Sequence, residues 1–207
     1  MNSFISFEGI DGCGKSTQIK ILSDKLSLNN IENIVIREPG DTGVSDKIRN
    51  ILLDKNNKIG EISETLLFLS ARAQLVKEKI IPFSNNNVVI CDRFIDSTVA
   101  YQGYGRNQDI ETINTLNNFA TGNINPDITF ILEINSKEAF KRLNSASLDR
   151  MELSGIEFLE KVSKGYKEIA LSNPDRCKVI DCNDKDIMMI HNEIITILNL
   201  FYGGDLI

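Results

Sequence analysis

The chain has 207 residues, of which 42% are hydrophobic and 25% are charged, and these values predict a single globular domain over residues 1–207. Its formal net charge of −6 excludes the dominant basic surface that a binder of polymeric nucleic acid needs, so any anionic ligand should be small and held in a local basic pocket. No apolar stretch approaches the roughly 20 residues of a membrane span, which excludes a membrane protein of that kind.

Runs of strand character alternate along the chain with longer stretches of helical periodicity. The strand-like runs cover residues 4–7, 33–37, 88–92, 128–134 and 178–181. Such alternation predicts parallel strands joined by crossover helices. Two of the runs are almost continuously apolar, as expected when helices cover both faces of a sheet. The predicted fold is therefore α/β, with three layers and a parallel sheet of about five strands.

A glycine-rich segment lies between the first strand and a helix-like run over 17–28. It reads Gly9-Ile10-Asp11-Gly12-Cys13-Gly14-Lys15-Ser16, followed by Thr17, and satisfies the phosphate-loop pattern G-x-x-x-x-G-K-[ST]. Its backbone amides and the positive end of the next helix favour a bound polyphosphate. Lys15 is expected to reach the outer phosphates of a nucleotide, with Ser16 as a ligand of Mg²⁺. An ordinary glycine-rich turn is the alternative.

The next candidates lie after the second strand and on the following helical runs. Arg49 could hold a second phosphate, although a solvated surface arginine fits the spacing equally well. Phe68 and Arg72 are four residues apart, so they would share a helix face, where a ring could stack on a base while a guanidinium reads its edge. Taken alone, Phe68 on an apolar helix is more often a core residue.

Two polar residues follow directly on the apolar run 88–91 of the third strand. They are Asp92 and Arg93, and they lie at the sheet edge where ligands bind in open α/β folds. Asp92 is placed to hold Mg²⁺ through water, and Arg93 to grip a phosphate, although a surface ion pair is the alternative. The segment 96–106, which contains Thr98, Tyr101 and Gln102, is rich in hydrogen-bonding and aromatic groups suited to a sugar and a base.

The second half of the chain offers fewer signals. Residues 144–150 form a small-residue stretch that is either a mobile flap or a plain connection between helices.

The four cysteines are too irregularly spaced for a tetrahedral zinc site, and we expect reduced thiols and a cytoplasmic location. The single histidine, His191, lies far from every motif, so no histidine-based chemistry is expected. Phosphoryl transfer does not require any, because it depends mainly on positioning and positive charge.

Taken together, these motifs resemble the thymidylate kinases, which phosphorylate dTMP to dTDP. The resemblance runs nearly end to end and includes the segments at 7–9, 37–40, 67–72, 92–97, 100–103 and 149–152 in the family's order. It implies a P-loop nucleoside monophosphate kinase fold, with ATP and Mg²⁺ on the side of Lys15 and Ser16. It also implies a homodimer.

The resemblance further implies roles for the acceptor-side residues. Phe68 would stack on thymine, Arg72 and Gln102 would read its edge, and Thr98 would touch the base. Arg49 and Arg93 would grip the acceptor phosphate. Tyr101 would press on the sugar, and Asp11 would approach a sugar hydroxyl or Mg²⁺.

The family places a catalytic arginine either in the phosphate loop or on a flexible lid. Here the loop carries Gly12, so the charge should come from a lid at about 142–152, although that lid lacks the several arginines common in this branch. Arg150 is the expected transition-state cation, with Arg142 second. A further departure is Asp41, where many relatives have glycine. Its carboxylate could weaken affinity for the acceptor, but it is expected to point to solvent.

Two other interpretations of the function stay open. One is another nucleoside or nucleotide kinase of the same fold, since the choice of dTMP over dUMP depends on the resemblance alone. The other is a nucleotide-dependent switch that hydrolyses slowly and signals through a partner. The chain contains no Asn-Lys-x-Asp sequence, which counts against a GTPase.

Overall fold

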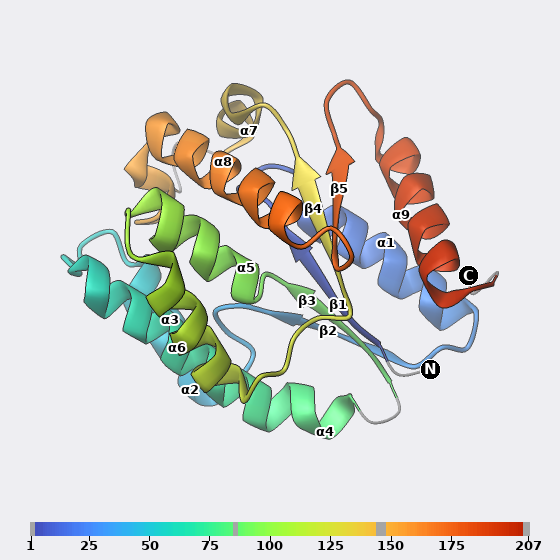
Figure 1. The fold of residues 1–207 in the computed structure, drawn as a ribbon, viewed down its shortest axis with the longest axis horizontal. Coiled ribbons are helices and arrows are strands. Elements are labelled where there is room, and N and C mark those ends of the chain that lie inside the picture. Colours follow the sequence, from blue (N-terminus) through green and yellow to red (C-terminus); the bar gives the residue numbers. More distant parts are fainter. Residues whose placement is uncertain (1–2, 85–86, 144–147, 205–207) are drawn as a thin grey trace.

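The computed structural model describes residues 3–84, 87–143 and 148–204, and its core is one parallel sheet (Figure 1). The strands are β1 (Ser3–Glu8), β2 (Asn33–Arg37), β3 (Val88–Asp92), β4 (Ile128–Glu133) and β5 (Cys177–Asp181), in the spatial order β2-β3-β1-β4-β5. Each predicted strand is present within a residue or so of its expected ends. The central strands are apolar because helices cover both of their faces.

Helices connect the strands and account for most of the remaining chain. They are α1 (Lys15–Leu28), α2 (Gly43–Leu53), α3 (Glu61–Leu75), α4 (Ile81–Phe83), α5 (Ile95–Thr98), α6 (Ile110–Thr121), α7 (Ser136–Arg142), α8 (Ile156–Ser172) and α9 (Ile187–Tyr202). Two π-helical segments, η1 (Val76–Ile80) and η2 (Val99–Gly105), continue α3 and α5, and a 3₁₀ turn, η3 (Glu152–Ser154), precedes α8. Among the described residues, no helix is long and apolar enough to cross a membrane.

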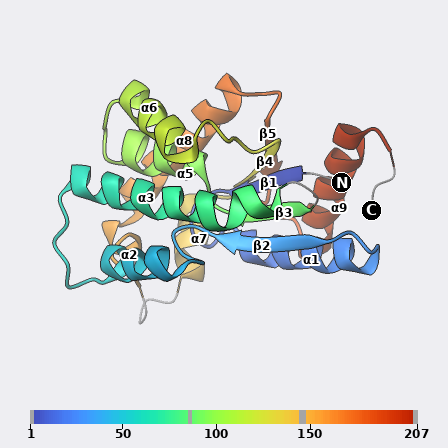
Figure 2. The same cartoon turned by 90° about the horizontal axis from the view of Figure 1, so that it is seen from below.

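The helices lie in two layers with the sheet between them. Helix α1 packs against α9 and the central strands on one face, whereas α8 packs against η2 and β4 on the other (Figure 2). Several helices begin where a short polar side chain accepts a backbone N–H, as Thr42 does before α2 and Asp186 before α9. The arrangement of a parallel sheet between two layers of helices confirms the three-layer α/β prediction.

The carboxyl ends of β1, β2 and β3 meet at one edge of the sheet. The phosphate loop follows β1, the segment containing Glu38 follows β2, and Arg93 follows β3, so the topology brings three candidate segments together. Segment η2 and α3 then supply the candidate base-side residues. The predicted lid at 142–152 is described only at 142–143 and 148–152, and residues 144–147 lie outside the described part of the chain.

Candidate active site

Two adjoining pockets lie at this edge of the sheet. We call the first the inner pocket, and it is lined by Asp11, Glu38, Pro39, Arg49, Leu53, Phe68, Arg72, Arg93, Ser97, Thr98, Tyr101, Gln102, Asp149 and Met151. The second, the loop pocket, is lined by Asp11, Gly12, Gly14, Lys15, Ser16, Thr17, Arg37, Glu38, Arg49, Asp92, Arg93 and Arg142. Asp11, Glu38, Arg49 and Arg93 line both, so the two pockets share one wall.

The phosphate loop carries its lysine folded over its own backbone. Lys15 Nζ donates to the carbonyls of Gly9 and Ile10 at 3.1 and 3.2 Å, and the side chain is only 6% exposed. Gly12 has φ of +83°, and a Cβ atom there would lie 2.5 Å from the carbonyl oxygen of Ala139 on α7. The loop therefore cannot accept an arginine at position 12 without displacing α7.

Ser16 and Asp92, the two predicted magnesium ligands, lie side by side. The Ser16 hydroxyl donates to Asp92 Oδ2 at 3.4 Å. Among the described residues, no group of three or more His, Cys, Asp or Glu side chains could hold a metal by itself. Mg²⁺ is usually held by one or two protein oxygens together with substrate phosphates, so this pair fits such an ion.

Arg93 stands at the junction of the two pockets and is held by four side chains. Its Nη2 donates to Asp11 at 2.5 Å and to the Tyr101 hydroxyl at 3.1 Å, and its Nη1 donates to Ser97 and Tyr166 at 3.2 and 3.1 Å. The backbone is unusual here, because Arg93 has φ of +74°. Such conformations cost about 1–3 kcal/mol in a non-glycine residue and concentrate at functional sites.

Asp11 is the carboxylate that faces both Arg93 and the phosphate loop. Burial alone would raise its pKa, but the charges of Arg93 and Lys15 outweigh burial and lower the pKa from 3.8 to about 2. The Tyr101 hydroxyl also donates to Asp11 at 3.1 Å. Asp11 is therefore ionised at neutral pH and balances the positive charge of Arg93.

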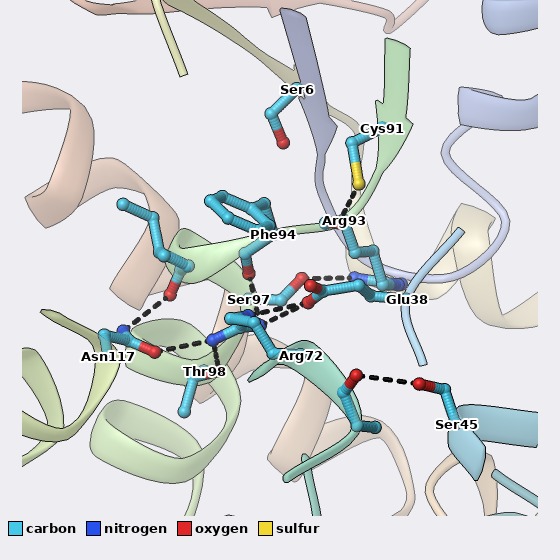
Figure 3. A network of polar contacts seen from close by, with 12 residues as sticks. Ser6, Glu38, Ser45, Arg72, Cys91, Arg93, Phe94, Ser97, Thr98 and Asn117 are labelled. Carbon is cyan, nitrogen blue, oxygen red and sulfur yellow. Dashed lines mark hydrogen bonds and ion pairs between the residues drawn. The ribbon is translucent and has the colours of Figure 1, made fainter. Parts of the chain in front are cut away.

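Arg72 lies at the back of the inner pocket, in a buried polar network (Figure 3). All five of its N–H groups have protein acceptors: Glu38 takes two at 2.8 and 2.6 Å, and Thr98, Asn117 and the Phe94 carbonyl take the others. Burial raises the pKa of Glu38 in spite of the Arg72 charge, and within the described residues Glu38 Oε1 has no hydrogen-bond partner. Arg72 is thus held rigidly and has no N–H group to spare.

The other predicted base-side residues line the same pocket. Phe68 is half-buried and contacts the core with part of its ring. Gln102 donates its Nε2–H to Glu64 at 3.1 Å, so its Oε1 is the end of the amide away from that carboxylate. The Thr98 hydroxyl accepts from Arg72 at 2.7 Å and keeps its own hydrogen to donate. The Tyr101 ring lies 5.0 Å below the Arg93 guanidinium.

The three remaining candidate arginines have different surroundings. Arg49 donates to the Pro39 carbonyl at 2.7 Å and lines both pockets, which places it at the site and not in bulk solvent. Arg142 is half-exposed, lines the loop pocket and donates to the Gly12 carbonyl at 3.4 Å. Arg150 donates instead to Glu64 and to the Leu52 carbonyl, both at 2.6 Å, and does not line the loop pocket.

The Asp41 carboxylate takes part in an exposed hydrogen bond. Its Oδ2 accepts the backbone N–H of Arg37 at 2.5 Å. Asp41 also has φ of +63°, a conformation that Asp tolerates better than most residues. The side chain therefore closes the turn after β2.

Besides Glu38, two more buried carboxylates at or near the site were not anticipated from the sequence. Glu8 is fully buried behind Arg93, and Glu64 is 1% exposed and accepts from Gln102, Arg106 and Arg150. The sequence does contain a signal for Glu8, because a charged residue inside an apolar strand needs partners to be buried.

A third cavity, the outer pocket, adjoins the loop pocket. It is lined by Cys13, Gly14, Thr17, Gln18, Arg142, Cys182, Lys185, Asp186, Ile187, Met188 and Ile190.

Comparison with known proteins identifies the family. The family model "Thymidylate kinase" matches residues 7–194. The chain is 45% identical over 199 residues to a thymidylate kinase of Thermoanaerobacter sp. (strain X514), covering 96% of this chain and 98% of the relative. It is 52% identical over 168 residues to that of Thermosipho africanus, covering 81% and 84%.

A solved structure supports the same assignment. The crystal structure of thymidylate kinase from Ehrlichia chaffeensis superposes with a TM-score of 0.78 at 38% identity, covering 95% of this chain and 98% of that one. Because the family model and these relatives span most of the chain, the conclusion extends to the whole fold. The chain belongs to the thymidylate kinase family.

Proposed function

We propose that this protein transfers the γ-phosphoryl group of ATP to the phosphate of dTMP, giving ADP and dTDP. The observation that carries the proposal is the shared wall of the two pockets, where Arg93 and Arg49 face a donor site on one side and an acceptor site on the other. An oxygen of the acceptor phosphate would attack the γ-phosphorus in line as its bond to the β–γ bridging oxygen breaks.

The donor would occupy the loop pocket and the outer pocket. Phosphate-loop amides and the N-terminus of α1 would hold its phosphates, with Lys15 turning from the Gly9 and Ile10 carbonyls to the outer phosphate oxygens. The outer pocket shares Gly14, Thr17 and Arg142 with the loop pocket, so it is placed to take the adenine and ribose.

Ser16 and Asp92 would hold Mg²⁺, which supplies charge to the β- and γ-phosphates when bound. The support is the 3.4 Å contact between two oxygen ligands beside the phosphate loop. The nearby Arg93 and Arg49 guanidiniums would contribute positive charge from the acceptor side.

The inner pocket would take dTMP, with Phe68 stacked on the base and Tyr101 against the sugar. Thr98 has a hydroxyl hydrogen for a base oxygen, and Gln102 can present Oε1 to a ring N–H. This polarity favours thymine or uracil over cytosine, whose N3 carries no hydrogen. Arg72 would act mainly by orienting Thr98, because all of its N–H groups have protein partners.

The lid arginine that completes the site is proposed to be Arg142, although the sequence favoured Arg150. Arg142 lines the loop pocket, where the transferred phosphoryl group would carry its charge, and it also lines the adjoining outer pocket. Arg150 is engaged with Glu64 and the α2 backbone, and we assign it a role in positioning the base of the lid.

The proposal is tested by measuring ATP consumption with dTMP, dUMP, UMP, CMP, AMP, GMP and thymidine as separate acceptors, with and without Mg²⁺. Rapid turnover with dTMP and far slower turnover with thymidine are expected, because Arg93 and Arg49 require an acceptor phosphate. Preference for another acceptor would favour a different kinase of this fold. Equal consumption with and without every acceptor would indicate the nucleotide-dependent switch.

We further propose a cytoplasmic homodimer. All four cysteines are free thiols, as in proteins of a reducing compartment. Helices α3 and α6 pack together and expose Ile62, Leu66 and Phe119, with exposed fractions of 71%, 49% and 87%. This apolar surface is a candidate contact between two copies.

A further inference from the structure

Glu8, the last residue of β1, is a buried carboxylate in a strand that is otherwise apolar except for Ser3 and Ser6. Its exposed fraction is 0%, and the described residues that line the inner and loop pockets do not include it. It also forms no direct ion pair with any described cation. A charge in such a place costs several kcal/mol unless hydrogen bonds compensate for lost water.

The shorter compensating bonds come from the segment around Arg93 and from α8, and Ser6 of β1 adds a longer one, with its hydroxyl donating to Glu8 Oε1 at 3.5 Å. Glu8 Oε1 accepts the Phe94 backbone N–H at 2.7 Å. Glu8 Oε2 accepts the hydroxyls of Ser97 and Tyr166 at 2.6 and 2.8 Å. The same two hydroxyls face Arg93 Nη1 at 3.2 and 3.1 Å.

We propose that Glu8 is a positioning residue for the acceptor phosphate, acting through Ser97 and Tyr166 to hold the Arg93 guanidinium where the two pockets meet. This inference rests on the proposed function, since it assumes that Arg93 binds the phosphate of dTMP. Glu8 touches no substrate in this arrangement. Its effect is carried by two hydroxyl groups, each of which has one hydrogen to donate and lone pairs to accept with.

The protonation state of Glu8 determines how the hydroxyl groups of Ser97 and Tyr166 are oriented. Each hydroxyl has a single hydrogen, and ionised Glu8 attracts both of them, which leaves oxygen lone pairs directed at Arg93. Protonated Glu8 must donate to one hydroxyl, and the Ser97–Tyr166 contact of 2.9 Å then takes up a hydroxyl hydrogen. The hydroxyl that accepts from Glu8 then has fewer lone pairs left for Arg93, and its own hydrogen no longer points to a carboxylate, so the acceptors at Arg93 Nη1 are less well oriented. The bond from Glu8 to the Phe94 N–H also secures the strained backbone of Arg93.

Proton uptake by Glu8 falls in an accessible pH range. Burial, and secondarily the Asp96 carboxylate, raise the pKa of Glu8 from 4.5 to about 7, although Arg93 opposes the shift. Other ionisable groups near it are Arg176, which pairs with Asp96 at 2.6 Å, together with Tyr166, Cys91 and Cys177. Asp11 has a pKa of about 2 and stays ionised over the same range.

The test compares wild type with Glu8→Gln and Tyr166→Phe in steady-state kinetics and in direct dTMP binding by calorimetry. Glu8→Gln is expected to raise KM and Kd for dTMP about tenfold while kcat changes less than threefold, as for loss of one charge-assisted hydrogen bond. Tyr166→Phe removes one of the two relays and should give a smaller effect. The double variant should be less than additive, because both changes act through one network.

A pH series separates positioning from a merely structural role. From pH 8 to 6, wild type should lose dTMP affinity more steeply than Glu8→Gln, and subtracting the two profiles removes the titration of the dTMP phosphate itself. Asp96→Asn removes the neighbouring carboxylate that raises the pKa of Glu8, so it should lower the melting temperature and move the fall in dTMP affinity to lower pH.

The possible outcomes are distinct. A folded Glu8→Gln enzyme with wild-type KM and a parallel pH profile overturns the inference. If Glu8→Gln does not fold, Tyr166→Phe with unchanged dTMP affinity overturns it. A wild-type enzyme that does not phosphorylate dTMP at all contradicts the proposed function itself, which is a different result.

Discussion

Arg142 and Arg150 flank the same segment of the chain but have opposite environments. Arg142 is half-exposed beside the Gly12 carbonyl, whereas Arg150 is 12% exposed and bonded to Glu64 and Leu52. A side chain that acts in the transition state must reach the phosphate site, and one that is tied to a buried carboxylate serves the fold. The two residues should therefore separate in kinetics and stability.

We expect Arg142→Ala to lower kcat by about 10²–10³-fold with little change in KM for dTMP, because it removes charge from the phosphoryl transition state. Arg150→Ala should instead lower the free energy of unfolding by about 2 kcal/mol, since Glu64 loses a buried partner. Steady-state kinetics and urea unfolding of both variants measure this. A larger loss of kcat in Arg150→Ala would return the catalytic role to Arg150.

His191 is a buried ionisable group without a function in the site. It is 2% exposed on α9, and neither ring nitrogen has a hydrogen-bond partner among the described residues. Burial, with a smaller effect from Lys25, lowers its pKa below 6.5. The unfolded chain then binds a proton that the folded chain rejects, so stability falls as the pH drops through 6.5 toward the folded-state pKa.

Replacing His191 should remove this pH dependence. His191→Leu is expected to raise the free energy of unfolding by about 1 kcal/mol at pH 7 and to flatten its decline between pH 7 and 5. His191→Gln is the matched control, which cannot titrate but keeps polar atoms buried, so it should flatten the pH dependence without the gain. Melting curves at several pH values decide the matter, and an unchanged slope in both variants would contradict it.

The contact between α8 and η2 determines where Tyr101 and Gln102 stand. Gly165 of α8 allows this approach, because a Cβ atom there would lie 2.8 Å from Cβ of Tyr104. Tyr104 cannot move that atom without moving the backbone of η2. The close approach of η2 to α8 therefore depends on a glycine on a distant helix, a contact that periodicity alone does not reveal.

Gly165→Ala is expected to lower the free energy of unfolding by about 1–3 kcal/mol by overpacking this contact, and to raise KM for dTMP by displacing η2. Gly43→Ala at the start of α2 is the control, since nothing lies within 4 Å of its Cβ position. That variant should be neutral or slightly stabilising. Chemical unfolding and dTMP kinetics of the pair test the argument, and equal stabilities would refute it.

The architecture of the whole molecule could be predicted because its signals are local. Apolar strand runs, the phosphate loop and the acidic and basic residues at strand ends each lie within a few residues of sequence, and parallel topology gathers them at one edge. Glu8, Glu38 and Glu64 were not assigned roles, because their partners lie on other elements. The positions of Arg142 and Arg150 likewise depend on tertiary contacts, so sequence spacing alone could not distinguish their roles.

Association of two copies is the remaining question about the whole molecule. Ile62 and Leu66 are one helical turn apart on α3, and Phe119 on α6 is more exposed than any other aromatic residue described. Burying such side chains against a second copy contributes about 1.5–3 kcal/mol each, enough for three of them on each side to offset much of the cost of association. Sedimentation of the wild type should therefore give about twice the chain mass of 23.2 kDa.

Charged substitutions on this surface should separate the copies. The double variant Leu66→Glu and Phe119→Asp should sediment near 23.2 kDa, because carboxylates placed in an apolar contact cannot be desolvated without loss. Leu200→Glu is the control, an equally apolar residue that is 78% exposed on α9, a helix that packs against α1 and β5, and it should remain dimeric. A monomeric wild type would contradict the homodimer, and a dimeric double variant would assign the contact to another face.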